Sequence, residues 1–301
     1  MEVAEIVLTI NTQIIPICIF LIMMGMGLTL TLADFKRVLS YPKAVSIGLI
    51  NQLLFLPVIG FSLANLMQLE PEYAVGVMLL VLCPGGTTSN MFSHLAKGDV
   101  ALSVTLTAVA SLITVFSIPI VLSFSLIHFM GEGKEFQLPI MATIFSLMKL
   151  TIVPICIGMM IRRFNRPLAD KAQSYVSRFG IIFLTVLILF LLYIQKDIVV
   201  PALIATGPVS ILLNISTMLL GYYSSKLFKL NAAQTRSITI EVGLQNSTLS
   251  MFMALSILAN YKMSFTPAIY TLIMLFTAGV LVRLFRSQYA LTSISTVNND
   301  N

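Results

Sequence analysis

The chain has 301 residues, of which 57% are hydrophobic and 10% charged, and its mean hydropathy is +0.96. A soluble domain of this length is far less apolar, so the composition indicates a polytopic membrane protein in a lipid bilayer. The net charge of +6 does not predict a nucleic-acid partner, because Lys and Arg gather in the cytoplasmic loops of membrane proteins.

About 20 mostly apolar residues are needed for one helix to span a bilayer, and the chain contains nine runs of this kind. We therefore predict an all-α protein with about nine transmembrane helices in a single domain, residues 1–286, followed by a polar, disordered cytoplasmic tail, 287–301. The runs lie at about 7–31, 43–68, 73–97, 100–130, 139–161, 179–195, 203–225, 234–260 and 265–285.

The basic residues predict the orientation. Alternate connections hold 14 Lys and Arg on one side and three on the other, and the longest connection, about 162–178, holds five of them. By the positive-inside rule, the N-terminus is outside and the C-terminus is cytoplasmic, in a multi-pass protein of the inner (plasma) membrane.

Two of the runs contain polar interruptions. The third run is broken by Cys83-Pro84-Gly85-Gly86 followed by four polar residues, 87–90, and the eighth contains a carboxylate and two amides within 240–247. Proline and glycine disfavour a continuous helix. A pair of interrupted helices, one in each half of the chain, predicts a transporter site between inverted repeats. Five helices follow the centre and only four precede it, so one helix of a five-plus-five repeat is missing.

The carboxylate at membrane depth, Glu241, needs a partner, because an isolated buried charge costs several kcal/mol. If the two breaks meet, hydroxyl, amide and carboxylate oxygens gather there and suit a small alkali cation. No His or Cys belongs to this group of residues, which argues against zinc or copper. Its single carboxylate argues against calcium, magnesium and an intramembrane diphosphate enzyme. The oxygen-bearing residues are Gln52, Ser89, Asn90, Ser103, Thr107, Glu241 and Gln245.

Structural explanations stay open for each of these residues. Ser103 and Thr107 can bond to carbonyls of their own helix, and Gln52 can link two helices. The Pro84 segment can be a simple kink, and Lys149 can pair with Glu241 or extend into a cavity.

The chain resembles the bile acid:sodium symporter family from about Met23 to Arg286. The combination of the proline-glycine-glycine motif with Glu-Val-Gly-Leu-Gln-Asn is specific, whereas either motif alone is weak. The matching stretches are 25–29, 51–57, 83–90, 98–103 and 241–246.

This resemblance implies a panel domain, about 7–40 and 139–195, and a core domain, about 43–130 and 203–286, in which two discontinuous helices cross. It also implies two bound sodium ions and an organic anion near Thr87 and Asn246. A histidine of some relatives has no counterpart in 271–276, which weakens bile-acid specificity more than sodium coupling. The first ion would use Ser89, Asn90, Ser103, Thr107 and Glu241, and the second Gln52, Glu241, Gln245 and the carbonyls of Val242 and Leu244.

The sequence therefore predicts a sodium-coupled symporter, not an enzyme, with no evident obligate protein partner. It would import an amphipathic organic anion, either bile-acid-like or a small carboxylate such as a pantoate-like metabolite, by alternating access. A proton-coupled transporter that uses Glu241 is the alternative.

Overall fold

The computed structural model describes residues 8–131 and 138–299, and every regular element in this part of the chain is helical, which confirms the all-α prediction. The first half forms α2 (Ile15–Gly27), α3 (Leu32–Ser40), α4 (Pro42–Ile50), α5 (Leu56–Leu66), α6 (Pro71–Leu82), α7 (Thr87–Leu95) and α8 (Val100–Met130). The second half forms α9 (Ile140–Leu147), α10 (Val153–Phe164), α11 (Arg166–Ile194), α12 (Lys196–Leu227), α13 (Ala232–Gly243), α14 (Ser247–Phe252) and α15 (Tyr261–Asn299).

Within the described residues, seven continuous helical stretches are long and apolar enough to span a membrane. The pair α6 and α7, bent by 63° at its break, raises the number to eight if it counts as one span. The eighth predicted run is divided into α13, with 12 residues, and α14, with six, so neither is long enough to cross alone. The expected number of nine stays a prediction.

Within the described residues, four π-helical turns interrupt the α-helices, and three of them have a common local cause. Pro16, Pro57 and Pro154 each follow such a turn, and the carbonyl four residues earlier, with which a proline ring clashes, lies inside it. The wider turn accommodates the ring without ending the helix. The turns are Ile10–Ile14, Asn51–Phe55, Met148–Ile152 and Met253–Ile257.

The connection predicted at 162–178 is wrong as a loop. Helix α10 ends at Phe164 and α11 begins at Arg166, and the side chain of Asn165 accepts a hydrogen bond from the Leu168 N–H at 3.0 Å. The apolar run begins only at about residue 179, but the N-cap residue Asn165 lets the polar first turns of α11 form before that run. Helix α15 likewise continues to Asn299, into the segment for which the sequence predicts disorder, and this segment contains neither glycine nor proline.

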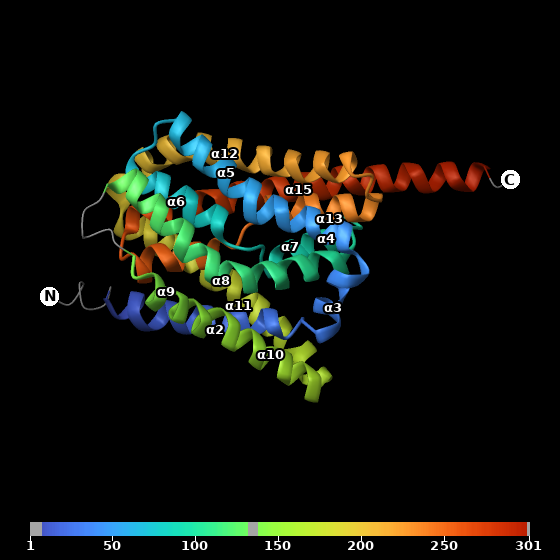
Figure 1. Ribbon diagram of the computed structural model, residues 1–301, viewed down its shortest axis with the longest axis horizontal. Helices are drawn as coiled ribbons and strands as arrows, with labels where there is room; N and C mark the ends of the chain where they lie inside the picture. The colour runs from blue at the N-terminus through green and yellow to red at the C-terminus, as the bar shows by residue number, and fades with distance from the viewer. Residues whose placement is uncertain (1–7, 132–137, 300–301) are drawn as a thin grey trace.

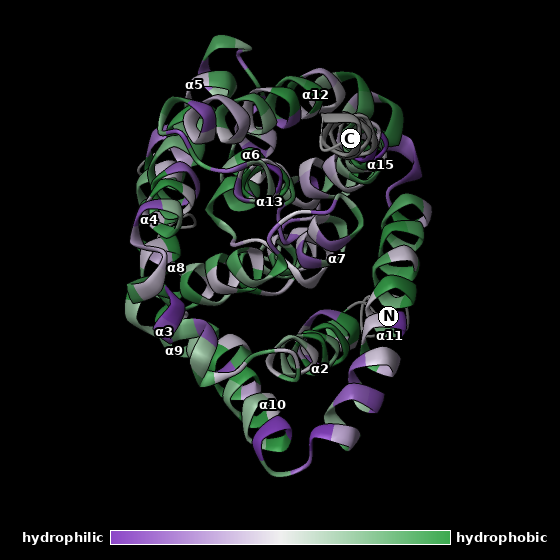
Figure 2. Ribbon diagram, turned by 90° about the vertical axis from the view of Figure 1, so that its right-hand side faces the viewer, coloured by the Kyte–Doolittle hydropathy of each residue, from purple (hydrophilic) through white to green (hydrophobic). Residues whose placement is uncertain are grey.

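The helices form two groups (Figure 1). Helices α2, α10 and α11 pack against one another, while α5, α6, α12, α13 and α15 make a second, larger group that contains both broken helices. Figure 2 shows α2 and α10 on the opposite side of the molecule from α5, α6 and α12, with α7 and α13 between them, while α11 runs along one side and contacts α12. The site described below lies where α2 and α11 face the two helix breaks.

Candidate functional site

The two helix breaks meet. The first leaves Cys83 extended before Pro84, as expected of a residue that precedes proline, and α7 restarts at Thr87. The second separates α13 from α14 at residues 244–246. The backbone N–H of Asn246, which a continuous helix would bond to Val242, donates instead to the Pro84 carbonyl at 2.9 Å. Each break therefore satisfies part of the backbone of the other.

The carbonyls released by the second break find other donors. The Ser247 N–H, which would otherwise reach the Gly243 carbonyl, donates to the Gln245 carbonyl at 2.9 Å. The Val242 carbonyl accepts from the side-chain amide of Gln245 at 2.8 Å. The unwound segment therefore places backbone carbonyls at a depth where ordinary helices offer none.

Four of the predicted residues surround one another at these breaks. Glu241 is fully buried; its Oε2 accepts from Ser103 Oγ at 2.7 Å, and its Oε1 accepts from Thr107 Oγ1. Ser103 Oγ is also 2.8 Å from Asn90 Oδ1, and Thr107 Oγ1 is 3.5 Å from the same atom. Helices α7, α8 and α13 thus bring these side chains together.

The cluster has more acceptors than protons. Besides the four contacts above, Thr107 Oγ1 lies 3.0 Å from the Ser103 carbonyl, so the two hydroxyls make five contacts with acceptor oxygens; Ser103 also accepts from the Ser93 hydroxyl at 3.2 Å. Each hydroxyl has one proton to donate. With Glu241 ionised and the Asn90 oxygen facing the hydroxyls, at least three of these five contacts join oxygens with no proton between them. A cation would relieve the resulting repulsion.

Ser89, the remaining residue of the first predicted set, lies on α7, and Gly85 lies in the break just before that helix. Ser89 is fully buried and donates to the Gly86 carbonyl at 2.7 Å. A Cβ atom on Gly85 would overlap Oε1 of Glu241 and lie 3.3 Å from Ser89 Oγ. Glycine is therefore required at residue 85 for the carboxylate to approach this backbone.

The second predicted set contains buried polar atoms without partners. Gln52 is 2% exposed, and neither its Oε1 nor its Nε2 has a hydrogen bond; Gln245 Oε1 has none either. Buried polar atoms of this kind usually have partners, and leaving them without one costs about 1–3 kcal/mol each. Val242 and Leu244 are buried beside Gln245, but no hydrogen bond among the described residues joins Gln52 to Glu241 or Gln245.

Lys149 does not pair with Glu241. Its side chain is exposed on the turn between α9 and α10, and no Lys or Arg among the described residues makes an ion pair with Glu241. Ser103 and Thr107 are not explained by bonds within their own helix alone, because each also contacts Glu241.

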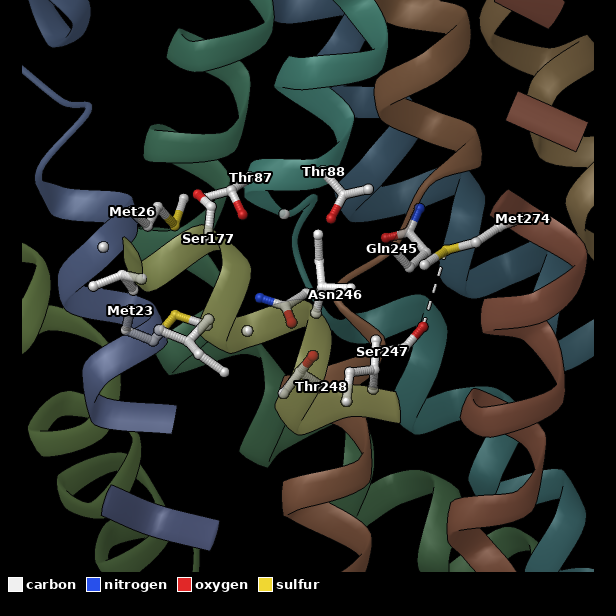
Figure 3. A pocket seen from close by; sticks show the side chains of 17 residues that line it. Met23, Met26, Thr87, Thr88, Ser177, Gln245, Asn246, Ser247, Thr248 and Met274 are labelled. Atoms are coloured by element: carbon white, nitrogen blue, oxygen red, sulfur yellow. Dashed lines mark hydrogen bonds between the residues drawn. The ribbon is translucent and has the colours of Figure 1, made fainter. Parts of the chain in front are cut away.

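A cavity of about 90 Å³ lies beside the meeting breaks (Figure 3). Thr87 at the start of α7 and Asn246 before α14 both line it, as do Met23 and Met26 from α2 and Ser177 from α11. Figure 3 shows Met23, Met26 and Ser177 on the side of the cavity opposite Gln245 and Met274. No charged side chain lines this cavity.

Sequence reasoning missed two buried residues that hold the second break. Asn214 Nδ2 and Tyr270 Oη lie 3.0 Å and 2.8 Å from the Gly243 carbonyl. An amide in the middle of the apolar run 203–225 is a signal that could have found Asn214. Tyr270 has no comparable signal, because tyrosine is common in membrane helices.

Broken helices that meet around buried polar groups are typical of secondary transporters, and comparison with known proteins agrees with this class. The sequence profile of the Sodium Bile acid symporter family matches residues 16–202. The chain belongs to this family, which confirms the resemblance inferred from its motifs.

Three relatives illustrate the similarity. The chain is 34% identical over 242 residues to the uncharacterized sodium-dependent transporter YocS of Bacillus subtilis (strain 168), covering 80% of this chain and 73% of that protein. It is 32% identical over 237 residues to the probable chloroplastic sodium/metabolite cotransporter BASS1 of Arabidopsis thaliana, covering 77% and 56%. It is 31% identical over 242 residues to the human hepatic sodium/bile acid cotransporter, covering 77% and 67%.

Proposed function

We propose that this protein is a sodium-coupled symporter that imports a small organic anion, with two sodium ions bound in each cycle. The observation that carries the proposal is the excess of acceptors around Glu241, where two hydroxyl protons serve five contacts with acceptor oxygens. A monovalent cation with oxygen ligands satisfies such a cluster. The sodium named in the descriptions of the three relatives supports the same ion here.

The first ion is held by Ser89, Asn90, Ser103, Thr107 and Glu241. The second is held by Gln52, Glu241, Gln245 and the carbonyls of Val242 and Leu244. The unpaired amide atoms of Gln52 and Gln245 support the second site, because an ion or its water would supply their missing partner. Two sodium ions and one carboxylate leave a net charge of +1 beside the breaks. An anion therefore binds well only when both ions are present.

The anion binds in the cavity, in contact with Thr87 and Asn246. With no charged side chain in the lining, its carboxylate is attracted by the bound ions and by the positive end of the α7 dipole. A volume of about 90 Å³ is well below the roughly 300–1,000 Å³ of pockets that hold drug-sized ligands. This size favours a small carboxylate such as a pantoate-like metabolite over a steroid.

Transport proceeds by alternating access in a fold of nine spans with inverted repeats. The panel, 7–40 and 139–195, moves against the core, 43–130 and 203–286, in a multi-pass plasma-membrane protein with its N-terminus outside and its C-terminus cytoplasmic. The separate packing of α2, α10 and α11 supports this division. The cavity is lined by the C-terminal half of α2 and the N-terminal half of α11, which face the cytoplasm in this orientation.

Coupling to protons through Glu241 is the less favoured alternative. A proton would neutralise one carboxylate oxygen but leave the amide oxygens of Gln52 and Gln245 unsatisfied. Uptake driven by a pH gradient in the absence of sodium would favour it.

The test begins with ion binding, because this needs no knowledge of the substrate. Sodium chloride should raise the unfolding temperature of the purified protein above its value in potassium chloride. Glu241→Gln keeps the size of the side chain but removes its charge, so the sodium effect should disappear. Glu70→Gln, which changes a carboxylate 61% exposed at the protein surface, should respond like the wild type.

Uptake into proteoliposomes then tests coupling, with labelled pantoate as the small anion and taurocholate as the large one. A sodium gradient should drive uptake and a potassium gradient should not. Equal rates with the two gradients, or normal sodium-driven uptake by Glu241→Gln, would refute the proposal.

A further inference from the structure

The carbonyl of Gly243, the last residue of α13, has two donors that lie outside its own helix. Tyr270 Oη, from α15, donates at 2.8 Å, and Asn214 Nδ2, from α12, donates at 3.0 Å. These two bonds occupy both lone pairs of the carbonyl. They replace the bond from Ser247 that a continuous helix would make, since that N–H is used elsewhere.

The amide of Asn214 is itself held in one orientation. Its Oδ1 lies 2.6 Å from Thr277 Oγ1, which is about two turns beyond Tyr270 on the same face of α15, and its Nδ2 is 3.1 Å from Tyr270 Oη. Because the Gly243 carbonyl can only accept, the amide end that faces it must be Nδ2, and Oδ1 then faces the Thr277 hydroxyl, whose proton is shared with two carbonyls of α15 at 3.0 Å and 3.1 Å. Asn214 and Tyr270 are fully buried, so water cannot substitute for either bond.

The side chain of Met218, from α12, also packs directly over Gly243. A Cβ atom on Gly243 would lie 2.9 Å from Met218 Cε and would overlap Met218 Cγ. The end of α13 is therefore held by packing against Met218 and by the hydrogen bonds from Asn214 and Tyr270.

We propose that Asn214 and Tyr270 form a carbonyl clamp that positions the unwound segment for ion binding. They are positioning residues, because neither contacts the proposed ions. The clamped carbonyl lies between the two whose oxygens hold the second ion, those of Val242 and Leu244. Leu244 is extended, with φ −113° and ψ 109°, and successive carbonyls of extended backbone point to alternate sides. Holding the Gly243 carbonyl towards α12 and α15 directs the Leu244 carbonyl away from them.

The inference rests on the proposed function, and it predicts an effect that simple loss of a buried bond would not produce. Tyr270→Phe removes one of the two donors and keeps the ring. The unwound segment then samples other conformations, so the half-saturating sodium concentration should rise roughly three- to tenfold, as expected from the loss of one hydrogen bond to a buried carbonyl. Thr277→Val removes the hydroxyl that faces the Asn214 amide oxygen. It should raise the half-saturating sodium concentration by a smaller factor, about two- to threefold.

The experiment is a sodium titration of the unfolding temperature, followed by sodium-dependent pantoate uptake, on wild type, both variants and Tyr223→Phe. Tyr223 is an exposed tyrosine of α12, so its variant should match the wild type. The sodium half-saturation should rise in Tyr270→Phe while the half-saturation for pantoate, measured at saturating sodium, stays near the wild-type value.

A Tyr270→Phe protein that unfolds at a lower temperature but keeps the wild-type sodium half-saturation would overturn the clamp. If that variant cannot be purified in folded form, an unchanged half-saturation in Thr277→Val overturns it instead. A wild type that does not respond to sodium at all would refute the proposed function, which is a different result.

Discussion

Replacement of Gly85 by alanine places one methyl group at the most crowded point of the ion site. The new Cβ would overlap Glu241 Oε1 and lie 2.9 Å from its Cδ and 3.3 Å from Ser89 Oγ. The carboxylate is the group that must move, because Gly85 lies in backbone that the bond from Asn246 to Pro84 holds in place. Gly85→Ala therefore displaces Glu241 without changing any charge.

The adjacent glycine provides a matched control. A Cβ on Gly86 would have only ordinary contacts, 3.9 Å from the Thr88 nitrogen and 4.0 Å from Asn246 Cγ. Overpacking of a buried site costs about 1–3 kcal/mol. If that cost falls on ion binding, Gly85→Ala raises the half-saturating sodium concentration roughly five- to 150-fold, whereas Gly86→Ala leaves it within about twofold of the wild-type value.

Both variants would be measured by sodium-dependent thermal stabilisation and by sodium-driven pantoate uptake at increasing sodium concentration. Equal sodium half-saturation in Gly85→Ala and Gly86→Ala would refute the reasoning, because the two substitutions add the same methyl group and differ only in what it meets.

Three further substitutions test stability. Gly98→Ala adds a Cβ 2.5 Å from Ser237 Oγ where the α7–α8 turn packs on α13, so it should lower the free energy of unfolding by about 1–3 kcal/mol. Gly279→Ala, within α15 and with no neighbouring atom within 4 Å of the added Cβ, should raise it by about 0.5–1 kcal/mol. Equal changes in denaturant unfolding in detergent would contradict the steric argument. Lys262→Met removes ion pairs at the protein surface, of 3.4 Å with Glu70 and 3.7 Å with Glu72. It should lower the free energy of unfolding by less than about 1 kcal/mol and leave sodium-driven uptake unchanged. A loss of uptake would show that these pairs serve transport.

Local chemistry made the helix breaks predictable. Pro84 cannot donate a backbone hydrogen bond, and glycines and polar side chains follow it, so a break could be inferred without knowing what surrounds it. The carboxylate of Glu241 could likewise be recognised as a group that needs a partner, because its cost depends on membrane depth alone.

Helix boundaries were less predictable because apolarity marks where a helix meets lipid, not where it begins. The polar turns of α11 and the short helix α3 lie outside the apolar runs, and each is started by local capping: Asn165 caps α11, and Thr31 and Asp34 form a capping box at α3 with a 2.7 Å bond. The π-helical turns before the prolines could have been predicted from the sequence, because a proline inside a helix clashes with the carbonyl four residues earlier and that carbonyl must move.

By itself, the sequence determined where the chain cannot remain helical and which oxygens it carries to those positions, because both follow from the covalent chemistry of single residues. Only the tertiary structure decided which groups meet. Ser103 and Glu241 are 138 positions apart in the chain, and Tyr270 reaches Gly243 across 27. Contacts of this kind depend on how whole helices pack, and no local pattern around Asn214 or Tyr270 specifies which carbonyl either residue will hold.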